Sequence, residues 1–246
     1  MKTVVIHPDY TFCADFIHRL PDIFHTEGET IYKSRNEIKV FEVNGIMINV
    51  KQYKTPAFPN RIIYTFFRTT KAYRAYNYAI KLLSKGIETP QPIAYIRLKK
   101  TGLIHHCYFI SLQSPYTRNM YEFGKGSLNG RETIIRSLAR FTAKLHDSGV
   151  YHKDFSPGNI LFQQTVDEVK FSLVDINRLR FGPVSLKKGC ANFARLWGSK
   201  EMFRLLAQEY AIARQADTID CIRWVYGYRK RFWGKYSRKH EILFEL

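Results

Sequence analysis

Alternating apolar and polar positions run through the first part of the chain and predict β-strands. Residues 38–43 and 46–51 both alternate, and the Asn-Gly pair at 44–45 between them is a strong signal for a tight turn. We therefore expect these two runs to form a β-hairpin. Two more strands are predicted further along the chain, over residues 92–96 and 103–112.

The strand-rich first part of the chain contains one segment with helical periodicity, and most of the second half shows this periodicity. In residues 71–85 the apolar positions recur three or four residues apart, which predicts one helix among the strands. Later, Asn129 and Glu132 match a capping box with the asparagine as the cap, so we expect a helix to begin there and to end at Gly149. The chain from about residue 191 onward is also predicted to be helical.

The polar residues 152–159 separate that helix from two short predicted strands, 160–162 and 169–174. The order of elements predicts an α+β fold with two lobes: a small strand-rich N-terminal lobe over residues 1–113 and a helical C-terminal lobe over residues 114–246. A chain of 246 residues with 45% hydrophobic content is long enough to bury cores of this size.

The charge balance of the chain is strongly positive. Lys and Arg number 39 against 21 Asp and Glu, which gives a formal net charge of +18. A surface with this excess repels itself and attracts anions, so nucleic acid, anionic lipid and phosphorylated glycan are all candidate partners. Charge alone does not choose among them.

Cysteine usage and the absence of long apolar runs indicate the compartment. The four cysteines are scattered, without any metal-ligand spacing, which is typical of a reducing compartment. The N-terminus meets a His, a Pro and an acid before a signal-peptide core could form, and no run of about 20 apolar residues exists. We expect a cytoplasmic protein that contacts a membrane, if at all, from that side.

The candidate chemistry lies in the segment His152-x-Asp154-x-x-x-x-Asn159 and in Asp175 after a hydrophobic strand. Phosphoryl transfer requires a carboxylate that accepts the hydroxyl proton, oxygen ligands that hold Mg²⁺, and a cation on the phosphates. Asp154 and Asn159 supply a carboxylate and an amide oxygen five residues apart on one loop, and Asp175 supplies a second carboxylate. Mg²⁺ prefers such oxygen ligands.

This segment resembles the catalytic loop of protein kinases, with Lys153 in place of the usual Arg. Residues 174–177, Val-Asp-Ile-Asn, resemble the Asp-Phe-Gly metal motif with Asn in the Gly position. The resemblance implies that Asp154 is the catalytic base and that Asn159 and Asp175 bind Mg²⁺ beside ATP.

The same resemblance implies that Lys51 is the strand lysine that binds the ATP phosphates, while Lys54 is the alternative because it ends a similar apolar-flanked strand. His152 is expected to brace the loop rather than to react. The N-terminal lobe would therefore bind ATP, and the C-terminal lobe would be catalytic.

Within the protein-kinase-like superfamily, the chain most resembles the lipopolysaccharide-core sugar kinases of the Kdo and heptose kinase group, over roughly residues 30–200. The resemblance is carried by the segments 50–56, 68–74, 86–94, 145–152 and 174–178. It implies ATP- and Mg²⁺-dependent phosphorylation of a sugar hydroxyl in the inner core, on an anionic lipid-linked glycan. Such kinases work at the cytoplasmic face of the bacterial inner membrane.

Three features depart from the kinase pattern. No Gly-rich loop precedes Lys51, and the nearest candidates for phosphate contact are Gly28 and residues 34–36. The following helix should offer a Glu to pair with the lysine, but Ala75 stands at the expected position. No Ala-Pro-Glu segment follows Asp175, which argues against a peptide-binding activation segment.

The C-terminal segment 223–239 interleaves bases with aromatic residues and contains no acid. Such amphipathic side chains suit an anionic membrane surface, where rings lie at headgroup depth and cations meet phosphate. The alternative is that the rings pack on the C-terminal lobe while the bases only solvate its surface. Nucleic acid is not an expected partner, because no RNA-binding fingerprint accompanies the segment.

Three other functions are compatible with the same loop motif. An aminoglycoside or choline-type phosphotransferase would have cationic acceptors, which a positive enzyme repels. A protein Ser/Thr kinase is weakened by the missing activation segment. A pseudokinase scaffold that binds anionic glycolipid is supported by the missing helix Glu and Gly-rich loop, but the presence of Asp154, Asn159 and Asp175 together opposes it.

Overall fold

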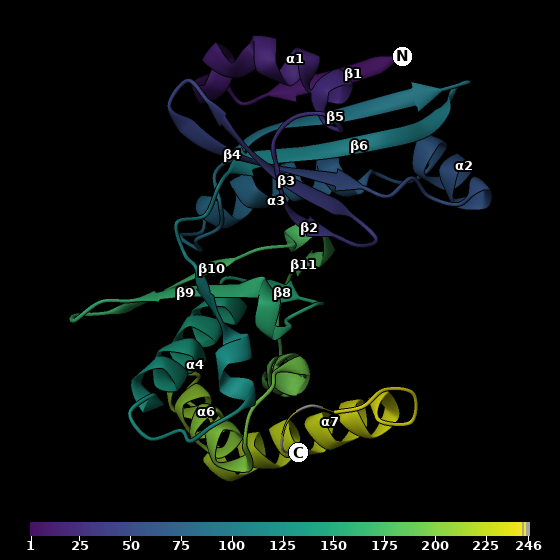
Figure 1. Ribbon diagram of the computed structural model, residues 1–246. Helices are drawn as coiled ribbons and strands as arrows, with labels where there is room; N and C mark the ends of the chain where they lie inside the picture. Colours follow the sequence, from purple (N-terminus) through teal and green to yellow (C-terminus); the bar gives the residue numbers. More distant parts are fainter. Residues whose placement is uncertain (243, 245–246) are drawn as a thin grey trace. The chain divides into compact units, whose positions relative to one another are not determined.

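The computed structural model describes residues 1–242 and 244, and the chain divides into two compact units, residues 1–115 and 116–246. Each unit has its own secondary structure and its own buried core (Figure 1). The first unit is rich in strands and the second in helices, which confirms the predicted α+β fold class.

The first unit is built on a six-stranded antiparallel sheet with the strand order β1-β5-β6-β4-β3-β2. Its strands are β1 (Lys2–Ile6), β2 (Glu29–Lys33), β3 (Glu37–Val43), β4 (Ile46–Tyr53), β5 (Pro92–Lys100) and β6 (Leu103–Leu112). The predicted hairpin is confirmed as β3 and β4. Asn44 and Gly45 both have positive φ, 51° and 78°, as a tight two-residue hairpin turn requires.

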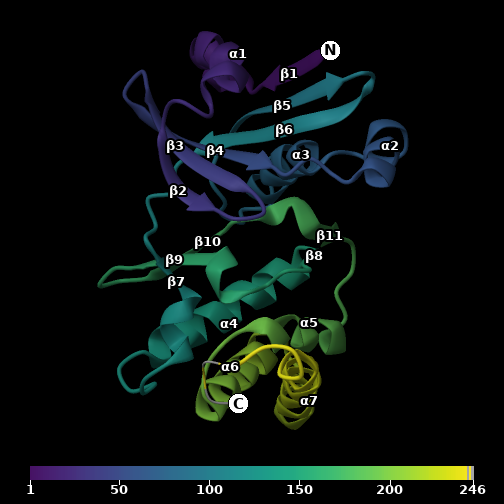
Figure 2. The same cartoon turned by 45° about the vertical axis from the view of Figure 1, so that its right-hand side comes forward.

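Helices cover both faces of this sheet (Figure 2). Ile48 and Val50 of β4 belong to the core cluster that also contains the buried residues of α1 (Ala14–Ile23). Tyr53 lies on the opposite face of β4, where it packs with Ala72 of α3 (Lys71–Leu83). Side chains alternate along a strand, so Lys51 shares the α3 face with Tyr53.

Two helices of the first unit were not predicted. The sequence patterns predicted no element before residue 38, yet α1 follows a short 3₁₀ helix, η1 (Pro8–Cys13), and places Ile17 and Leu20 in the core. A proline inside α1 interrupts the helical signal in the sequence. The second unpredicted helix is α2 (Phe58–Phe66), which has no buried residue at all.

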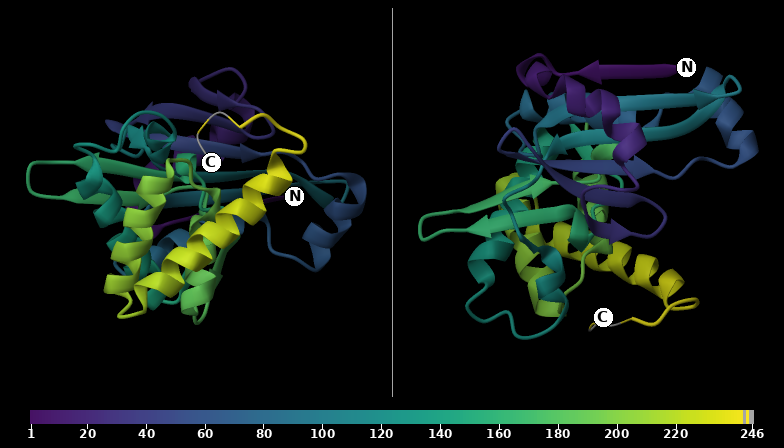
Figure 3. Two further views of the ribbon diagram at one scale, coloured as in Figure 1. Left: turned by 90° about the horizontal axis from the view of Figure 1, so that it is seen from below. Right: turned by 45° about the horizontal axis from the view of Figure 1, so that its top comes forward.

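In its described residues the second unit contains four α-helices and two small sheets, with strand orders β10-β9-β7 and β11-β8. The helices are α4 (Glu132–Asp147), α5 (Leu186–Asn192), α6 (Lys200–Ala213) and α7 (Thr218–Tyr236). The strands are β7 (Arg118–Asn119), β8 (Val150–His152), β9 (Ile160–Gln164), β10 (Val169–Leu173) and β11 (Leu179–Phe181). α6 packs against α4 and α7, and α7 also lies against α5 (Figure 3).

The predicted capping box of α4 is wrong. The N-cap of this helix is Arg131, and its side chain makes no capping hydrogen bond. Gly130 has a φ of 78°, which turns the chain, so the helix begins only after Arg131. Asn129 instead accompanies the turn, where its backbone N–H donates to Ser127 Oγ at 3.1 Å.

No helix in the described part of the chain combines the length and the apolar composition needed to cross a bilayer. The longest helix, α7, has 19 residues and carries several arginines and lysines.

The contact between Gly189 of α5 and the Tyr210 side chain of α6 yields the first prediction. A Cβ atom on Gly189 would lie 1.9 Å from the Tyr210 hydroxyl oxygen, so any side chain at this position displaces that hydroxyl from its place. We expect Gly189→Ala to lower the free energy of unfolding by about 1–3 kcal/mol, as overpacking does. Urea unfolding followed by circular dichroism measures this change.

Gly227 in α7 is the matched control, because a Cβ there would meet open space. Gly227→Ala should raise the free energy of unfolding by about 0.5–1 kcal/mol, since alanine is the better helix former. Equal effects of the two substitutions would contradict the packing argument.

Candidate active site

The predicted catalytic loop connects β8 to β9. β8 pairs with β11, which places His152 opposite Leu179 and fixes the start of the loop. The backbone N–H of Asp154 donates to His152 Nδ1 at 3.1 Å, and Asn159 Nδ2 donates to the backbone carbonyl of Asp154 at 2.9 Å. Both ends of the loop are therefore tied to Asp154, the predicted base.

His152 is fully buried and uses both ring nitrogens to hold backbone. Its Nδ1 accepts from Asp154, and its Nε2 lies 3.3 Å from the carbonyl oxygen of Val174, to which it donates when it carries the proton. Burial lowers the pKa of His152, which keeps the ring neutral and consistent with one donor and one acceptor. This arrangement supports the expected bracing role.

Asp175 stands directly after β10 in an unusual backbone conformation. Its φ of 52° and ψ of 42° are left-handed, which costs a non-glycine residue conformational energy and is concentrated at functional sites. Asn177 Nδ2 donates to Asp175 Oδ1 at 2.5 Å and so fixes the direction of the carboxylate. The asparagine in the glycine position of the motif thus has a role that the sequence did not indicate.

The two predicted magnesium ligands are held together by the backbone. The N–H of Val174 donates to the carbonyl of Asn159 at 3.0 Å, immediately before Asp175. Asn159 Nδ2 is engaged with Asp154, so its Oδ1 is the side-chain atom left for a cation. One carboxylate and one amide oxygen fit Mg²⁺, which takes few protein ligands and completes its shell with phosphate and water.

Both carboxylate oxygens of Asp154 are paired with arginines. Oδ2 lies 3.1 Å from Arg178 Nη1, and Oδ1 lies 2.9 Å from Arg195 Nη1. The Asp154 side chain is 22% exposed, so this double ion pair is partly shielded from water. Arg195 is positioned in turn by Phe232 of α7, whose ring centre is 5.0 Å from its guanidinium.

A buried chain of polar side chains supports the loop from behind. Asn192 Nδ2 donates to the carbonyl of His152 at 2.8 Å, and Asn192 Oδ1 lies 2.9 Å from His146 Nε2. His146 Nδ1 lies 2.8 Å from the hydroxyl of Tyr210, and Arg214 Nη1 donates to that same hydroxyl oxygen at 2.9 Å. Each of these polar side-chain groups has a hydrogen-bond partner if His146 is neutral with its proton on Nε2.

The pKa shifts agree with this assignment. Burial lowers the pKa of His146 to about 4, so the ring is neutral near pH 7. Burial also raises the pKa of Tyr210, which keeps the hydroxyl protonated as a donor to His146 Nδ1. Sequence reasoning missed Asn192, Tyr210 and Arg195, because no local pattern marks residues that reach the loop from distant helices.

Lys51 belongs to the first compact unit, so the group that the structure assembles in the second unit comprises Asp154, Asn159 and Asp175. Lys51 lies within β4, opposite Ile38 and Phe109 of the neighbouring strands. Its ammonium is 5.4 Å from the centre of the Tyr53 ring.

The alternative lysine has a different position. Lys54 follows the end of β4, and its backbone N–H donates to Asn36 Oδ1 at 3.3 Å. The choice of Lys51 over Lys54 stays a prediction. The predicted place of the missing acid, Ala75, is buried in α3.

A braced loop that carries an aspartate and an asparagine five residues apart, followed by a second aspartate directly after a strand, matches the predicted protein-kinase-like catalytic loop. A family model described as the lipopolysaccharide kinase (Kdo/WaaP) family matches residues 26–218. The chain therefore belongs to the lipopolysaccharide kinase family, which confirms the resemblance seen in the sequence.

A solved structure extends the likeness to the fold of nearly the whole chain. The structure titled "WaaP in complex with acyl carrier protein" superposes with a TM-score of 0.65 and covers 97% of this chain and 100% of its own. Its sequence identity of 14% is low, so this comparison shows the fold alone.

Curated relatives are named 3-deoxy-D-manno-octulosonic acid kinase. The Vibrio cholerae protein is 28% identical over 115 residues, 47% of each chain. The Haemophilus influenzae protein is 26% identical over 120 residues, 48% of this chain and 49% of the relative. That of Mannheimia succiniciproducens is 26% identical over 153 residues, 61% and 62%. The chain thus spans about half the length of the first two relatives.

The buried histidine generates a prediction about pH. The unfolded chain binds more protons than the folded chain between the ordinary pKa of 6.5 and the lowered value of about 4 for His146. The free energy of unfolding should therefore fall as the pH drops through this window, by on the order of 1 kcal/mol per pH unit from this residue. Urea unfolding at pH 7.5, 6.0 and 5.0 measures the slope.

His146→Gln should make the slope shallower, because glutamine does not titrate. His240→Gln, which alters an exposed histidine, should leave the slope as it is. An unchanged slope in His146→Gln would show that His146 is not a buried neutral group.

Proposed function

We propose that this chain transfers the γ-phosphoryl group of ATP to a sugar hydroxyl of the lipopolysaccharide inner core, on Kdo or heptose of a lipid-linked glycan. The observation that carries the proposal is the joint fixing of Asp154, Asn159 and Asp175 by one set of backbone contacts. Membership of the lipopolysaccharide kinase family supports the choice of acceptor.

Each residue has a separate role in this proposal. Asp154 accepts the proton of the acceptor hydroxyl, and Asn159 and Asp175 hold Mg²⁺. Mg²⁺, when bound, neutralises charge on the phosphates. Lys51 binds the phosphates of ATP, so residues 1–113 act as the ATP-binding lobe and residues 114–246 as the catalytic lobe.

The double ion pair on Asp154 indicates an anionic acceptor. A carboxylate has about four acceptor sites, so Asp154 keeps lone pairs for the acceptor proton while each oxygen is paired with Arg178 or Arg195. Both guanidiniums are also partly exposed, so a carboxylate or phosphate on the incoming sugar would bind them beside the base. The curated relatives are named for a sugar acid, which carries such a carboxylate.

We also propose peripheral contact with an anionic membrane surface, at the cytoplasmic face of the inner membrane. A lipid-linked acceptor lies at such a surface, and a net charge of +18 favours it.

The central prediction concerns the base. Asp154→Ala should reduce phosphate transfer from labelled ATP to purified core glycolipid by at least about 10²-fold, the usual contribution of a general base. Asp167→Ala, which removes an exposed acid in the β9–β10 turn, should transfer phosphate like the wild-type chain. Equal transfer by wild-type and Asp154→Ala would refute the proposed role.

The arginine pair allows a test of acceptor charge. Arg195→Ala should raise the KM for a carboxylate-bearing acceptor about tenfold, equivalent to losing about 1.4 kcal/mol of binding, and should affect a carboxyl-amidated acceptor much less. Arg204→Ala on α6, an exposed arginine, is the matched control and should change neither KM. An equal loss with both acceptors would mean that Arg195 acts only on Asp154.

A further inference from the structure

The helix α2 joins β4 to α3 and attaches to the sheet through polar side chains. Arg61 Nε donates to the carbonyl of Ile104 at 2.8 Å, and the Ile104 N–H donates to Thr65 Oγ1 at 2.9 Å. β4 ends at Tyr53, opposite Cys107, so the part of β6 that contains Ile104 has no partner on the β4 side. The two hydrogen bonds from α2 satisfy the backbone groups of Ile104 there. The polar side of α2 thus faces the protein and covers a sheet edge.

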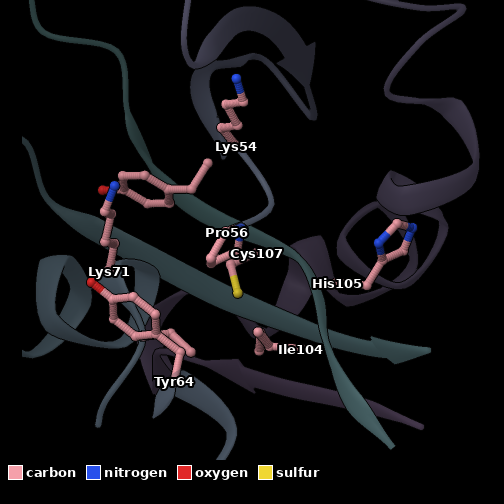
Figure 4. A pocket seen from close by; sticks show the side chains of 9 residues that line it. Lys54, Pro56, Tyr64, Lys71, Ile104, His105 and Cys107 are labelled. Carbon is pink, nitrogen blue, oxygen red and sulfur yellow. The ribbon is translucent and has the colours of Figure 1, made fainter. Parts of the chain in front are cut away.

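Tyr64 lies on the same inner side of α2. It lines a pocket together with Ile104, Cys107 and Lys71, and Figure 4 shows these side chains around one space. The phenol ring of Tyr64 is also 5.3 Å from the guanidinium of Arg68. The inward-facing residues of α2 are therefore Arg61, Tyr64 and Thr65.

The outward side of α2 and the residue after it are apolar and exposed. Phe58 is 63% exposed, Phe66 68% and Phe67 82%, and Ile62 and Ile63 are 38% and 44% exposed. An ordinary surface helix has the opposite arrangement, with its apolar stripe on the core and its polar stripe in water. A group of exposed rings and aliphatic side chains of this kind marks a contact surface.

The surroundings of this apolar surface are basic. Residues 43–87 contain no Asp or Glu, and their bases are Lys51, Lys54, Arg61, Arg68, Lys71, Arg74, Lys81 and Lys85. Lys54 and Arg68 are exposed next to α2. Lys100 is exposed at the tip of the β5–β6 hairpin, which lies beside α2 (Figures 1 and 3). Burial lowers the pKa of His105, and the positive charges of Lys100 and Arg61 lower it further. The occupant of this surface must therefore combine apolar and anionic groups.

The C-terminal segment, which the sequence suggested for membrane contact, offers a different surface. Trp233 is buried, Phe232 packs on Arg195, and the buried Arg229 donates to the carbonyl of Gly198 at 2.6 Å. Arg223, Lys230, Arg231 and Lys235 of α7 are exposed. α7 therefore presents charge to the solvent, while Trp233 and Phe232 pack against the protein.

We propose that the outer surface of α2, formed by Phe58, Ile62, Ile63, Phe66 and Phe67, inserts into the interface of an anionic bilayer. In this arrangement the rings lie at headgroup depth, and Lys54, Arg68 and Lys100 contact lipid phosphates. The inference deepens the proposed function, because a lipid-linked acceptor would be reached from such a surface. It does not depend on phosphate transfer itself.

Vesicle binding without ATP tests the inference. The full chain should sediment with phosphatidylglycerol–phosphatidylethanolamine vesicles and much less with phosphatidylcholine vesicles. Phe66→Ser combined with Phe67→Ser should lower the bound fraction at least about fivefold, because two exposed rings are lost without disturbing the core. The control pair Ile212→Ser and Ile219→Ser, exposed by 66% and 75% in the second unit, should bind like the wild-type chain.

A labelled cysteine gives a second readout. The four native cysteines are buried, so Phe67→Cys can be labelled with an environment-sensitive dye, with Ile219→Cys as the control. The dye at position 67 should shift to the blue with anionic vesicles, and the dye at position 219 should not. Undiminished vesicle binding by the double serine variant, or no shift at position 67, would overturn the inference and favour an acidic protein as the occupant.

The two proposals can fail separately. The double serine variant should phosphorylate a delipidated core oligosaccharide as fast as the wild-type chain does. A chain that binds vesicles through α2 but phosphorylates no core sugar would refute the proposed function and leave the membrane surface standing. Loss of transfer to the delipidated acceptor in the double variant would show that α2 has another role, and would overturn the inference.

Discussion

The hydrogen bond from Asn192 to the carbonyl of His152 anchors the start of the predicted catalytic loop to α5. The contact of Asn192 Oδ1 with His146 fixes the orientation of the amide that donates this bond, and His146 Nδ1 is paired in turn with the Tyr210 hydroxyl. Removal of any one partner leaves the next group buried and unsatisfied, at a cost of about 1–3 kcal/mol. Since a misplacement of about 1 Å can abolish much of the rate in a positioned reaction, these hydrogen bonds link the stability of the core to the position of Asp154, the proposed base.

The strand end at Asp175 shows how the second unit holds a strained residue in place. A left-handed aspartate costs energy that the surroundings must offset. Asn177 donates to its carboxylate, and the Val174–Asn159 hydrogen bond keeps the strand end beside the loop. A glycine at position 177 could not make the first of these contacts. Asn177, which replaces the glycine of the kinase motif, therefore helps to hold the strained Asp175 in place.

The features that the sequence predicted are those with local causes. The hairpin turn at 44–45 follows from two adjacent residues with positive φ, and the Asp154–Asn159 spacing lies within one loop. Arg195 and Asn192 reach that loop from about forty residues further along the chain, so no periodicity or spacing marks them. α2 was missed although its apolar positions recur at helical spacing, because nine residues are few for a periodicity signal and Pro56 and Pro59 stand at its start.

The basic charge of the chain indicates an anionic partner, but the number of aromatic residues does not say which of them meet it. On α7, Phe232 supports Arg195, and Arg195 pairs with Asp154, so a ring at the C-terminus contributes to the site instead of to a membrane. On α2 the attachment to the sheet is made by Arg61 and Thr65, which leaves the apolar side chains outward. The rings that the two helices carry thus face different surroundings, and only the packing of each unit decides which rings are exposed.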